Sequence, residues 1–541
     1  MSAGGCRHST LNIPRMKKTK ALSRVLGAIC LQAGLLSSCS KLPFLLPPHG
    51  SDGGPVVTTT RYYIDNNGSD SADGLSPNTA WKTLTKVNAT TFQPGDSVLF
   101  KRGNAWTGTL VIKSSGTHDA RITFGAYGTG DKPRIVGNNA TLSAVLIQDA
   151  KYLTFENFDV SHPRAVRPPD ISLSGIYVAL ATAGTYPGIC IKHNNIHDVE
   201  GMPITNRHLQ AGIFVRSNAA QAYFDSLTIE GNDLKRCSSR GIMMGDGSNK
   251  DTTYYNNNIV IRQNVVDSTA LEGIIVYTSK NVLIENNRVL NAGAYTLGVN
   301  MNIVLAGLWG RGKNMIIQHN EVAYTRLTNP VPYASMDSEA FDIDLGTPGY
   351  TIIQYNYSHD NQGGFFLHMG DPGPDFTYGI VRYNISQNDG DPFGNRVFEL
   401  HEHPNGKVVP IYIYNNTFYD ATKIGVLDRA GGTGVHPGLE FRNNIFYAPA
   451  TQFDDQANIV YDHNFYYPGP KAASDSTGYT VNPLLVAPGS GGSGINTVNG
   501  YKLQGNSPAI GAGVLISNNG GQDYFGKPVS ATMAPAVGAA Q

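Results

Sequence analysis

The stretch Ile261-Arg-Gln-Asn-Val-Val266 carries the pattern that decides the fold of this chain. An apolar residue is followed by two variable residues, an asparagine, one further variable residue and a second apolar residue. The pattern recurs at elastic steps, from 20 residues (444 to 464) to 38 residues (194 to 232). Its asparagines are Asn194, Asn232, Asn264, Asn287, Asn320, Asn356, Asn384, Asn416, Asn444 and Asn464. Such spacing predicts one structural turn per repeat, with loops absorbing the insertions.

Each repeat also contains short β-type runs, such as Gly212-Ile-Phe-Val215 and Gly273-Ile-Ile-Val276. Apolar residues alternate in these runs, and no helical period is present. Because the same strand recurs in every turn, we expect the turns to stack into parallel sheets that bury apolar residues against neighbouring turns. The asparagine column is predicted to be structural, bonding backbone groups and one another at the bends. Residues 151–470 are therefore predicted to form an all-β parallel solenoid.

The segments on either side of the solenoid are expected to cover its ends, because exposed sheet edges invite aggregation. Residues 61–150 are assigned to an N-terminal cap and the first coils. Ser76-Pro77 is predicted to open a short capping helix with Trp81, Leu84 and Val87 on its apolar side. Residues 471–541 are rich in Gly and Pro and are assigned to a C-terminal cap segment.

Residues 1–39 are interpreted as a signal peptide. Basic residues precede the apolar run 25–36, which is too short to span a bilayer. The run ends in Leu36-Ser-Ser-Cys39, which resembles a bacterial lipobox, so Cys39 is predicted to be lipidated; an ordinary signal peptide in which Cys39 has no role is the alternative. Residues 40–60 are interpreted as a linker. The expected location is the cell envelope, with the lipid anchor as the only membrane contact and the protein facing the periplasm or the outside, or else secretion.

The composition excludes several classes of protein. The chain has 541 residues, with 41 Lys and Arg against 41 Asp and Glu, and charged residues make up only 15%. A nucleic-acid binder needs a basic surplus, so no nucleic-acid partner is expected. A hydrophobic content of 40% supplies a core and argues against charge-driven disorder. Cys190 and Cys237 could pair, although their spacing does not decide this. A monomer is expected, since stacked coils need no partner.

The repeat and both ends of this region resemble the pectate-lyase-like, right-handed parallel β-helix superfamily of secreted bacterial polysaccharide-degrading enzymes. The opening Tyr62-Tyr-Ile-Asp-Asn-Asn-Gly-Ser-Asp70 is similar to the usual entry to such helices, and Ser507-Pro-Ala-Ile-Gly-Ala-Gly513 to their usual exit. The resemblance covers roughly residues 61–541. It implies a right-handed parallel β-helix and a polysaccharide partner, but the fold does not fix the reaction.

The chemistry is expected on outward positions that stack from coil to coil. In a strand of the type Gly-Ile-x-Val-x, the two variable residues point outward. Early coils carry mostly apolar or neutral residues there, whereas three consecutive later coils carry carboxylates and imidazoles. With coils about 4.8 Å apart, and with Asp342 and Asp344 about 6.5–7 Å apart along one strand, these groups would form one cluster. The residues predicted to be catalytic are Asp342, Asp344, His368, Glu399 and His401. The alternative is a solvated face with chance ion pairs.

Aromatic and basic residues near these columns are candidates for contacts with sugar rings and their polar groups. The aromatic residues could equally be covered by long loops. The predicted substrate-binding residues are Arg216, Tyr277, Trp309, Arg311, Phe366 and Arg429.

Three functions remain open at this stage. The first is a glycoside hydrolase acting on an acidic or hemicellulosic plant or algal polysaccharide. Two carboxyl groups would serve as acid and base at the separations that glycosidases use, the histidines would orient them, and no cofactor would be required.

The second is a polysaccharide lyase that acts by β-elimination on a uronic-acid polymer. The resemblance implies a Ca²⁺ ion, for which Asp342, Asp344 and Asp360 could offer oxygen ligands. The lyases of the family commonly use a Lys or Arg base, and no Lys falls in the outward columns beside these acids, which lowers this hypothesis. The third function is a non-catalytic adhesin or glycan-binding module.

Overall fold

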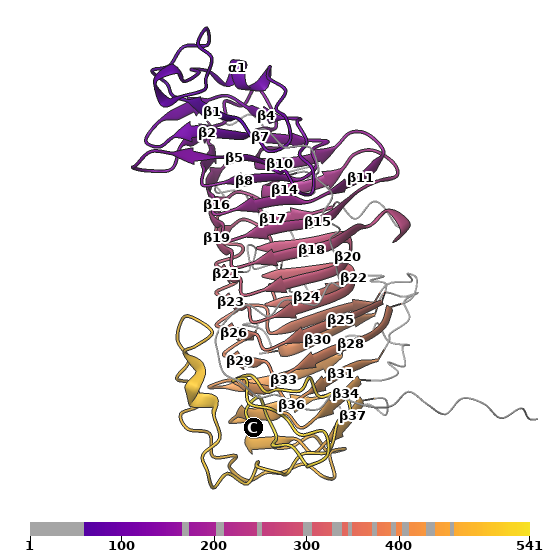
Figure 1. Ribbon diagram of the computed structural model, residues 1–541. Coiled ribbons are helices and arrows are strands. Elements are labelled where there is room, and N and C mark those ends of the chain that lie inside the picture. Colours follow the sequence, from indigo (N-terminus) through magenta and orange to yellow (C-terminus); the bar gives the residue numbers. More distant parts are fainter. Residues whose placement is uncertain are drawn as a thin grey trace, which may run out of the picture. The chain divides into compact units, whose positions relative to one another are not determined.

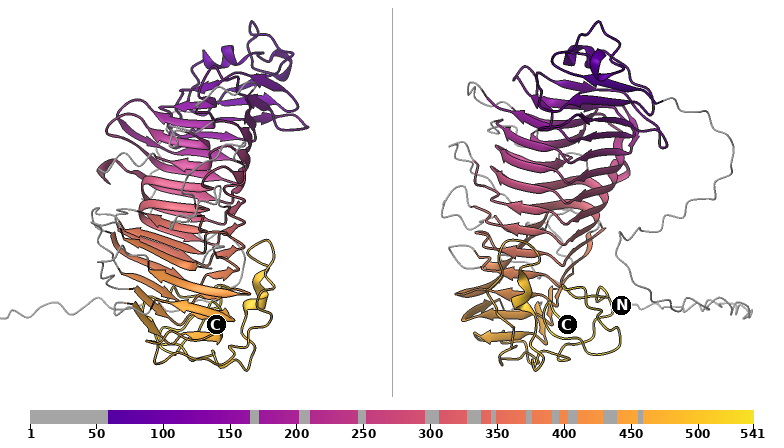
Figure 2. Two further views of the ribbon diagram at one scale, coloured as in Figure 1. Left: turned by 180° about the vertical axis from the view of Figure 1, so that it is seen from behind. Right: turned by 60° about the vertical axis from the view of Figure 1, so that its left-hand side comes forward.

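The computed structural model describes residues 59–541 except 165–171, 202–209, 246–251, 296–305, 327–337, 345–348, 371–375, 391–395, 403–409, 429–438 and 455–458. All of these residues belong to the second of two units, residues 57–541. Successive coils lie on one another in chain order, as the colours of Figures 1 and 2 show. Every pair of neighbouring strands between coils is parallel, which confirms the predicted parallel β-helix.

The strands form three stacks, which we call the first, second and third stack. The first comprises β4 (Leu110–Ile112), β7 (Ser143–Gln148), β10 (Ser174–Leu180), β14 (Ala211–Ser217), β17 (Arg240–Met244), β24 (Phe341–Asp344), β27 (Phe366–Gly370), β30 (Arg396–Glu402), β33 (Lys423–Asp428) and β36 (Ala450–Phe453). The second comprises β1 (Arg61–Ile64), β2 (Ser97–Lys101), β5 (Ile122–Tyr127), β8 (Leu153–Glu156), β11 (Gly184–Pro187), β12 (Ile189–Lys192), β15 (Ala222–Glu230), β18 (Asn256–Arg262), β25 (Gly349–Gln354), β28 (Phe376–Arg382), β31 (Ile411–Tyr414), β34 (Leu439–Arg442) and β37 (Ile459–Asp462).

Two long strands, β20 (Ile274–Glu285) and β22 (Leu308–Gln318), run through both of these stacks and join them into one sheet. The third stack is a separate sheet of β3 (Ala105–Thr107), β6 (Arg134–Val136), β9 (Asp159–His162), β13 (Asn195–Val199), β16 (Asp233–Cys237), β19 (Val265–Thr269), β21 (Arg288–Leu290), β23 (Glu321–Ala323), β26 (Tyr357–His359), β29 (Ile385–Gln387), β32 (Thr417–Tyr419), β35 (Ile445–Ala448) and β38 (Phe465–Pro468). The helices are α1 (Leu84–Asn88), η1 (Pro77–Thr79), η2 (Thr252–Tyr254) and η3 (Val498–Tyr501).

The asparagine column is a continuous buried ladder at the bend between the second and third stacks. Each side-chain amide donates to the Oδ1 atom of the asparagine in the next coil, at 2.9–3.1 Å from Asn194 to Asn464. Each amide also donates to a backbone carbonyl, and each Oδ1 atom accepts from a backbone N–H. Asp475 ends the ladder by accepting from Asn464 Nδ2 at 3.0 Å. The predicted structural role of the column is therefore confirmed.

The interior is narrow between the first and third stacks, which explains the glycines that begin strands of the first stack. A Cβ atom on Gly241 would lie 2.3 Å from Val266 Cγ1, and one on Gly273 would lie 2.2 Å from Val289 Cγ1. Both distances are far below van der Waals contact, so a larger residue would push the two stacks apart.

The N-terminal helix begins later than the sequence pattern predicted. Ser76 and Thr79 form a capping box around the short η1 helix, and Ala80 then turns to extended backbone. Helix α1 starts at Leu84, with the Thr83 side chain accepting from the Lys86 backbone N–H. The predicted apolar residues Trp81, Leu84 and Val87 are nevertheless buried.

The C-terminal segment packs along the outer side of the third stack. Leu485, Val498 and Tyr501 form an apolar cluster with Tyr357 and Ile385, which point outward from β26 and β29. Cys190 and Cys237 are both free thiols, so they do not pair. None of the helices in the described part of the chain combines the length and the apolar character that crossing a membrane requires. Cys39 lies outside the described residues.

Candidate active site

The outer face of the first stack changes from apolar to acidic along the chain. The strand register places Tyr177, Phe214, Met243 and Ile275 in one outward column. These residues form an apolar cluster of their own, outside the main core, together with Ala211, Tyr277 and Trp309. The same column then continues through Trp309, Asp342, Leu367 and Glu399. The acids therefore begin where a covered apolar column ends.

Asp342 and Glu399 stand in this column with one coil between them. Asp342 lies opposite Trp309 on β22 and Leu367 on β27, and Glu399 lies opposite Leu367 from the next coil. Two coil steps of about 4.8 Å separate the two backbone positions by about 9–10 Å. The residues are only 4% and 2% exposed. The structure thus brings together two of the predicted carboxylates in a covered site.

A second column lies beside the first. The backbone register aligns Asp344 with Met369 and then with His401. Asp344 follows Asp342 by two residues on β24, so both belong to the same strand. His401 likewise follows Glu399 on β30. The backbone register therefore places Asp342, Asp344, Glu399 and His401 within two coils of one another.

Two predicted site residues, His368 and Phe366, are not on this face. β27 pairs Phe366 with the core residue Phe341 and His368 with the core residue Ile343, so both occupy inward positions. Phe366 is fully buried, and His368 Nδ1 donates to the Ile343 carbonyl oxygen at 3.1 Å. The prediction was wrong because Phe365, rather than Gly364, takes the position that glycine holds in earlier strands. Leu367, which pairs in register with Asp342, occupies an outward position of β27 instead.

Of the remaining predicted contact residues, Tyr277, Trp309 and Arg311 lie within two coils of Asp342, whereas Arg216 lies four coils before it. The rings of Tyr277 and Trp309 meet edge to face, with centroids 5.2 Å apart, and Arg311 pairs in register with Tyr277. Arg216 takes the last outward position of β14 and pairs in register with Ala179. Arg429 lies outside the described residues.

Three buried charged residues on this face were not predicted. Arg240 and Glu272 form an ion pair, with Nε 2.7 Å from Oε2 and both side chains 1% exposed. Glu339 is equally buried. Each of these residues lies three positions before a member of the outward column: Arg240 before Met243, Glu272 before Ile275 and Glu339 before Asp342. The first residue of this column, Ala211, packs in the outer apolar cluster, which places the column on the outer face. A charged residue directly before the strand-opening Gly or Ala is the sequence signal that could have revealed them.

Asp360 does not join Asp342 as a metal ligand. It follows β26 in the third stack, with a left-handed φ of 56°, and its carboxylate contacts His359 Nδ1 at 2.8 Å. Asp342 lies on the outer face of a different sheet. Within the described ranges, no group of three or more His, Cys, Asp or Glu side chains is placed to hold a metal ion. The Ca²⁺ site suggested by the sequence groups Asp360 with Asp342, and the structure places these two residues in different sheets.

Comparisons with known proteins identify the type of coil. A family model described as "Right handed beta helix region" matches residues 124–322. The chain is 27% identical over 590 aligned positions to a lacto-N-biosidase from Bifidobacterium longum subsp. longum, covering 86% of this chain and 36% of that protein.

Two crystal structures of a GH136 lacto-N-biosidase from Eubacterium ramulus superpose with TM-scores of 0.54 and 0.53 at 24% identity, covering 78% of this chain and 66% of theirs. The chain thus spans about a third of the Bifidobacterium protein and about two thirds of the Eubacterium chain. The solved structures establish a right-handed parallel β-helix.

Proposed function

We propose that this chain, a right-handed parallel β-helix, is a glycoside hydrolase whose reacting carboxylates lie on the outer face of the first stack. The observation that carries the proposal is the pair of covered acids, Asp342 and Glu399, in one outward column. Two covered carboxylates in one outward column are the kind of clustered ionisable groups that active sites contain, which favours a functional role. The likeness to a lacto-N-biosidase over most of the chain supports the same reaction type.

The chemistry needs one carboxyl group that protonates the leaving oxygen and one carboxylate that activates water or attacks the sugar. Inverting glycosidases place the two groups about 6.5–9.5 Å apart, and retaining ones about 5–5.5 Å apart. The backbone positions of Asp342 and Glu399, about 9–10 Å apart, are nearer to the wider arrangement than to the narrower one. Asp342 and Asp344, neighbours on one face of β24, are the second possible pair. His401 stands beside Glu399 and is proposed to orient it.

Half-buried Trp309 is proposed to contact the sugar that lies next to the cleaved bond. Trp309 lies one coil before Asp342 in the same column, and Tyr277 packs against its ring. Aromatic faces bind the apolar side of a sugar ring, while Arg311, two residues after Trp309 on β22, can donate to its hydroxyl groups; Arg216, three coils before Arg311, would contact a more distant sugar unit.

The proposed substrate is a glycan that carries lacto-N-biose or a closely related neutral disaccharide unit. The similarity to the Bifidobacterium lacto-N-biosidase supports this substrate over the plant or algal polysaccharide that we expected from the sequence. No cofactor is proposed for the hydrolysis, because acid, base and water suffice.

An assay that separates hydrolysis from elimination tests the proposal. Purified protein is incubated with p-nitrophenyl lacto-N-bioside and with a panel of neutral and uronic-acid glycans, and released p-nitrophenol, reducing ends and ultraviolet absorbance are measured. Release of p-nitrophenol or reducing ends without the unsaturated chromophore is expected. Reducing ends together with the chromophore would instead establish a lyase, and no product on any substrate would leave a glycan-binding module.

We also propose a monomer held at the cell envelope through a lipid on Cys39. This proposal is supported by the basic residues and the short apolar run that precede Cys39 in the sequence. Metabolic labelling with a radioactive fatty acid should mark the wild-type protein but not Cys39→Ser, and labelling of both would remove Cys39 from the proposal.

A further inference from the structure

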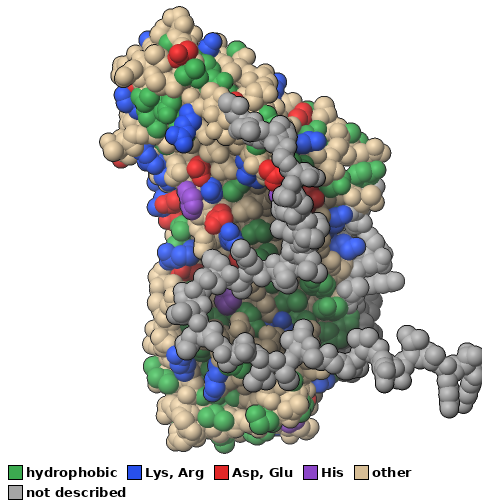
Figure 3. All heavy atoms as spheres, viewed as in Figure 1, with side chains coloured by type: hydrophobic (Ala, Val, Ile, Leu, Met, Phe, Trp, Pro, Cys, Tyr) green, Lys and Arg blue, Asp and Glu red, His purple; other side chains and the backbone are tan. Residues whose placement is uncertain are grey.

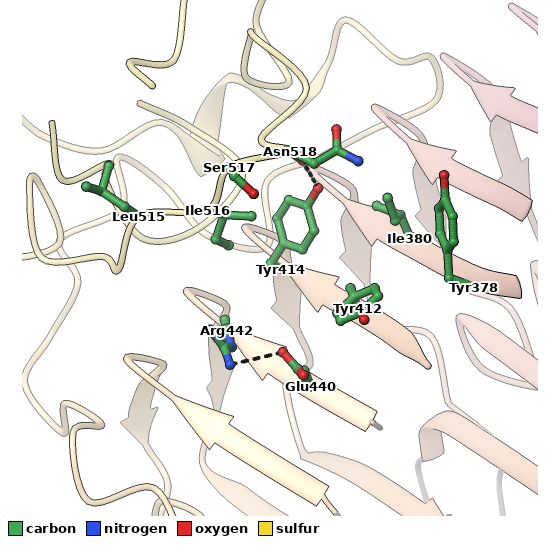
Figure 4. A pocket seen from close by; sticks show the side chains of 10 residues that line it. All are labelled: Tyr378, Ile380, Tyr412, Tyr414, Glu440, Arg442, Leu515, Ile516, Ser517 and Asn518. Atoms are coloured by element: carbon green, nitrogen blue, oxygen red, sulfur yellow. Dashed lines mark hydrogen bonds and ion pairs between the residues drawn. The ribbon is translucent and has the colours of Figure 1, made fainter. Parts of the chain in front are cut away.

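A cavity of about 430 Å³ lies on the second stack, on strands that carry none of the proposed catalytic residues. Its floor is built by residues of β28, β31 and β34. The central row of the floor consists of Ile380, Tyr412 and Glu440, which align from strand to strand. Its wall is the C-terminal stretch 515–518, which lies across from these strands (Figure 4). The volume is within the range of about 300–1,000 Å³ that small ligands occupy.

Part of the lining is aromatic and apolar. Tyr378 and Tyr412 are half-buried and offer ring surface to the cavity, and Tyr378 stacks on Tyr350 of the preceding coil with ring centroids 5.8 Å apart. On the facing wall, Leu515 is 49% exposed, although its side chain is large and hydrophobic. One exposed leucine needs no explanation, but Leu515 and the two tyrosines line the same cavity, which gives a ligand with an apolar face more than one surface to contact.

The polar part of the lining is an ion pair whose two partners can form further hydrogen bonds. Arg442 Nη2 lies 3.0 Å from Glu440 Oε2, and the side chains are 35% and 26% exposed. A guanidinium has five N–H donors and a carboxylate about four acceptor sites, so each partner can bind further groups. The pair carries no net charge, which disfavours phosphate, sulfate or a uronic acid. Adjacent donors and acceptors on a neutral pair suit the vicinal hydroxyl groups of a neutral sugar.

The wall is fixed in place before any ligand binds. Asn518 accepts from Tyr414 Oη and, at 2.8 Å, from Arg382 Nη1 through its backbone carbonyl. Beyond the other end of the cavity, Asn443 and Val514 exchange two hydrogen bonds of 2.8 Å. A wall anchored on both sides of residues 515–517 loses little freedom on binding, and this increases affinity for a given set of contacts.

We infer that this cavity is a non-catalytic binding site for a neutral sugar unit of a glycan. The inference goes beyond the proposed function, because it requires no bond cleavage and uses the second stack. The tyrosine rings and Leu515 contact the apolar faces of the sugar, and the Glu440–Arg442 pair contacts its hydroxyl groups. A site of this kind would hold a long glycan on the coil while another part of the chain reacts.

Isothermal titration calorimetry on the full chain tests the inference. The protein carries Asp342→Asn and Glu399→Gln, which removes the proposed catalytic acids, and the probes are lacto-N-biose, cellobiose, xylobiose and, as the charged comparison, digalacturonic acid. At least one neutral disaccharide should bind, and digalacturonic acid should bind at least about tenfold more weakly. Tyr412→Ala should raise the Kd about tenfold or more, which corresponds to the 1.4 kcal/mol of one lost ring contact.

Ser517→Trp is the second variant, because it fills the cavity from an exposed position and leaves the coil core unchanged. It should abolish binding while the melting temperature stays near that of the parent. Val460→Ala is the matched control, since Val460 continues the row of Ile380, Tyr412 and Glu440 one coil beyond the cavity lining, and binding should be unaffected. Binding that persists in both Tyr412→Ala and Ser517→Trp, binding of the charged disaccharide alone, or no binding of any neutral probe would overturn the inference. The glycosidase assay of the wild-type protein is independent of each of these outcomes.

Discussion

His359 Nε2 lies 3.2 Å from Glu321 Oε1, and both side chains are almost fully withdrawn from solvent. Glu321 also accepts from Arg288 Nε at 2.5 Å and from the Gly494 backbone N–H at 2.7 Å. The pair therefore joins β23 and β26 of the third stack to the C-terminal segment. Burial opposes the ionised form of both groups, but the hydrogen bonds outweigh it, raising the pKa of His359 to about 9 and lowering the pKa of Glu321 to about 2.

These shifts predict an alkaline loss of stability. A histidine whose pKa is raised by folding stabilises the native state fully below its unfolded pKa of about 6.5, and this stabilisation is lost as the pH rises through about 9. The melting temperature should therefore fall between pH 7 and 9. His359→Gln should be less stable at pH 7 and should show a flatter profile in this window, as measured by circular dichroism. Parallel profiles for both proteins would remove His359 as the cause.

The same measurement has an internal check at low pH. The stabilisation from Glu321 is present above its unfolded pKa and is lost as the pH falls from about 4.5 to 2. Fully buried Asp389 acts in the opposite direction, because burial raises its pKa to about 7 and its contribution is lost as the pH rises from about 4 to 7. Asp389 titrates around pH 7 and overlaps the start of the alkaline window, so the difference between the wild-type and His359→Gln profiles, rather than the wild-type profile alone, isolates His359.

The asparagine ladder should be costly to interrupt at any rung. Asn320 Nδ2 donates to Asn356 Oδ1 and to the Ile284 carbonyl, and its Oδ1 accepts from the backbone and side chain of Asn287. Asn320→Ala leaves several of these buried groups unsatisfied, at about 1–3 kcal/mol each. We expect the free energy of unfolding in urea to fall by at least about 3 kcal/mol. Asn138→Ala, at an exposed asparagine, is the control and should change it by less than about 0.5 kcal/mol.

The glycine column predicts a measurable coupling between two stacks. Gly273→Ala places a methyl group 2.2 Å from Val289 Cγ1 and should cost about 1–3 kcal/mol. Val289→Ala creates space at the same point, so the double variant should be destabilised by less than the sum of the single ones. Gly505→Ala, where a Cβ meets nothing within 4 Å, is the control. Strict additivity in the double-mutant cycle would contradict the close approach described here.

The fold could be predicted from sequence because its signals are local and repeated. The asparagine column and the alternating runs each recur in coil after coil, so an error in one coil is corrected by the others. The same logic located Asp342 and Glu399, whose strands keep the common spacing. It failed at β27, where Phe365 and Phe366 are both apolar and the alternation permits two registers. Tertiary pairing with Phe341 and Phe398 selects the register that turns His368 inward.

Other features have no local signal. The wall at Leu515 approaches Tyr412 only because Asn518 bonds Arg382 and Tyr414, more than a hundred residues earlier in the chain. The sequence alone does not show that Asp360 and Asp342 belong to different sheets, because it does not reveal which stack a strand joins after a turn. Arg240, Glu272 and Glu339 do have a local signal, since each directly precedes a strand-opening Gly or Ala, but this position lies before the alternating run from which outward residues are predicted.

The buried Arg240–Glu272 pair should tolerate joint replacement better than single replacement. Glu272→Gln leaves a guanidinium buried without its counter-charge, which typically costs about 3–5 kcal/mol. Replacing both residues by Met and Leu removes both charges and should cost less than Glu272→Gln alone. Thermal and urea unfolding of the three proteins measure this difference. A double variant less stable than the single one would show that the pair contributes through other contacts on the outer face.

The two acids in the outward column should behave differently from each other when the leaving group changes. Asp342→Asn and Glu399→Gln should each lower kcat on a natural glycan by about 10²–10⁴-fold, the usual contribution of a general acid or base. A dinitrophenyl leaving group departs without protonation, so the variant that lacks the acid should regain most of its activity on a dinitrophenyl glycoside. The variant that lacks the base or nucleophile should stay inactive on both substrates. Glu285→Gln makes the same chemical change on the second stack and should keep wild-type kcat. If both acid variants keep near-normal kcat while folded, the outer face of the first stack is not the active site.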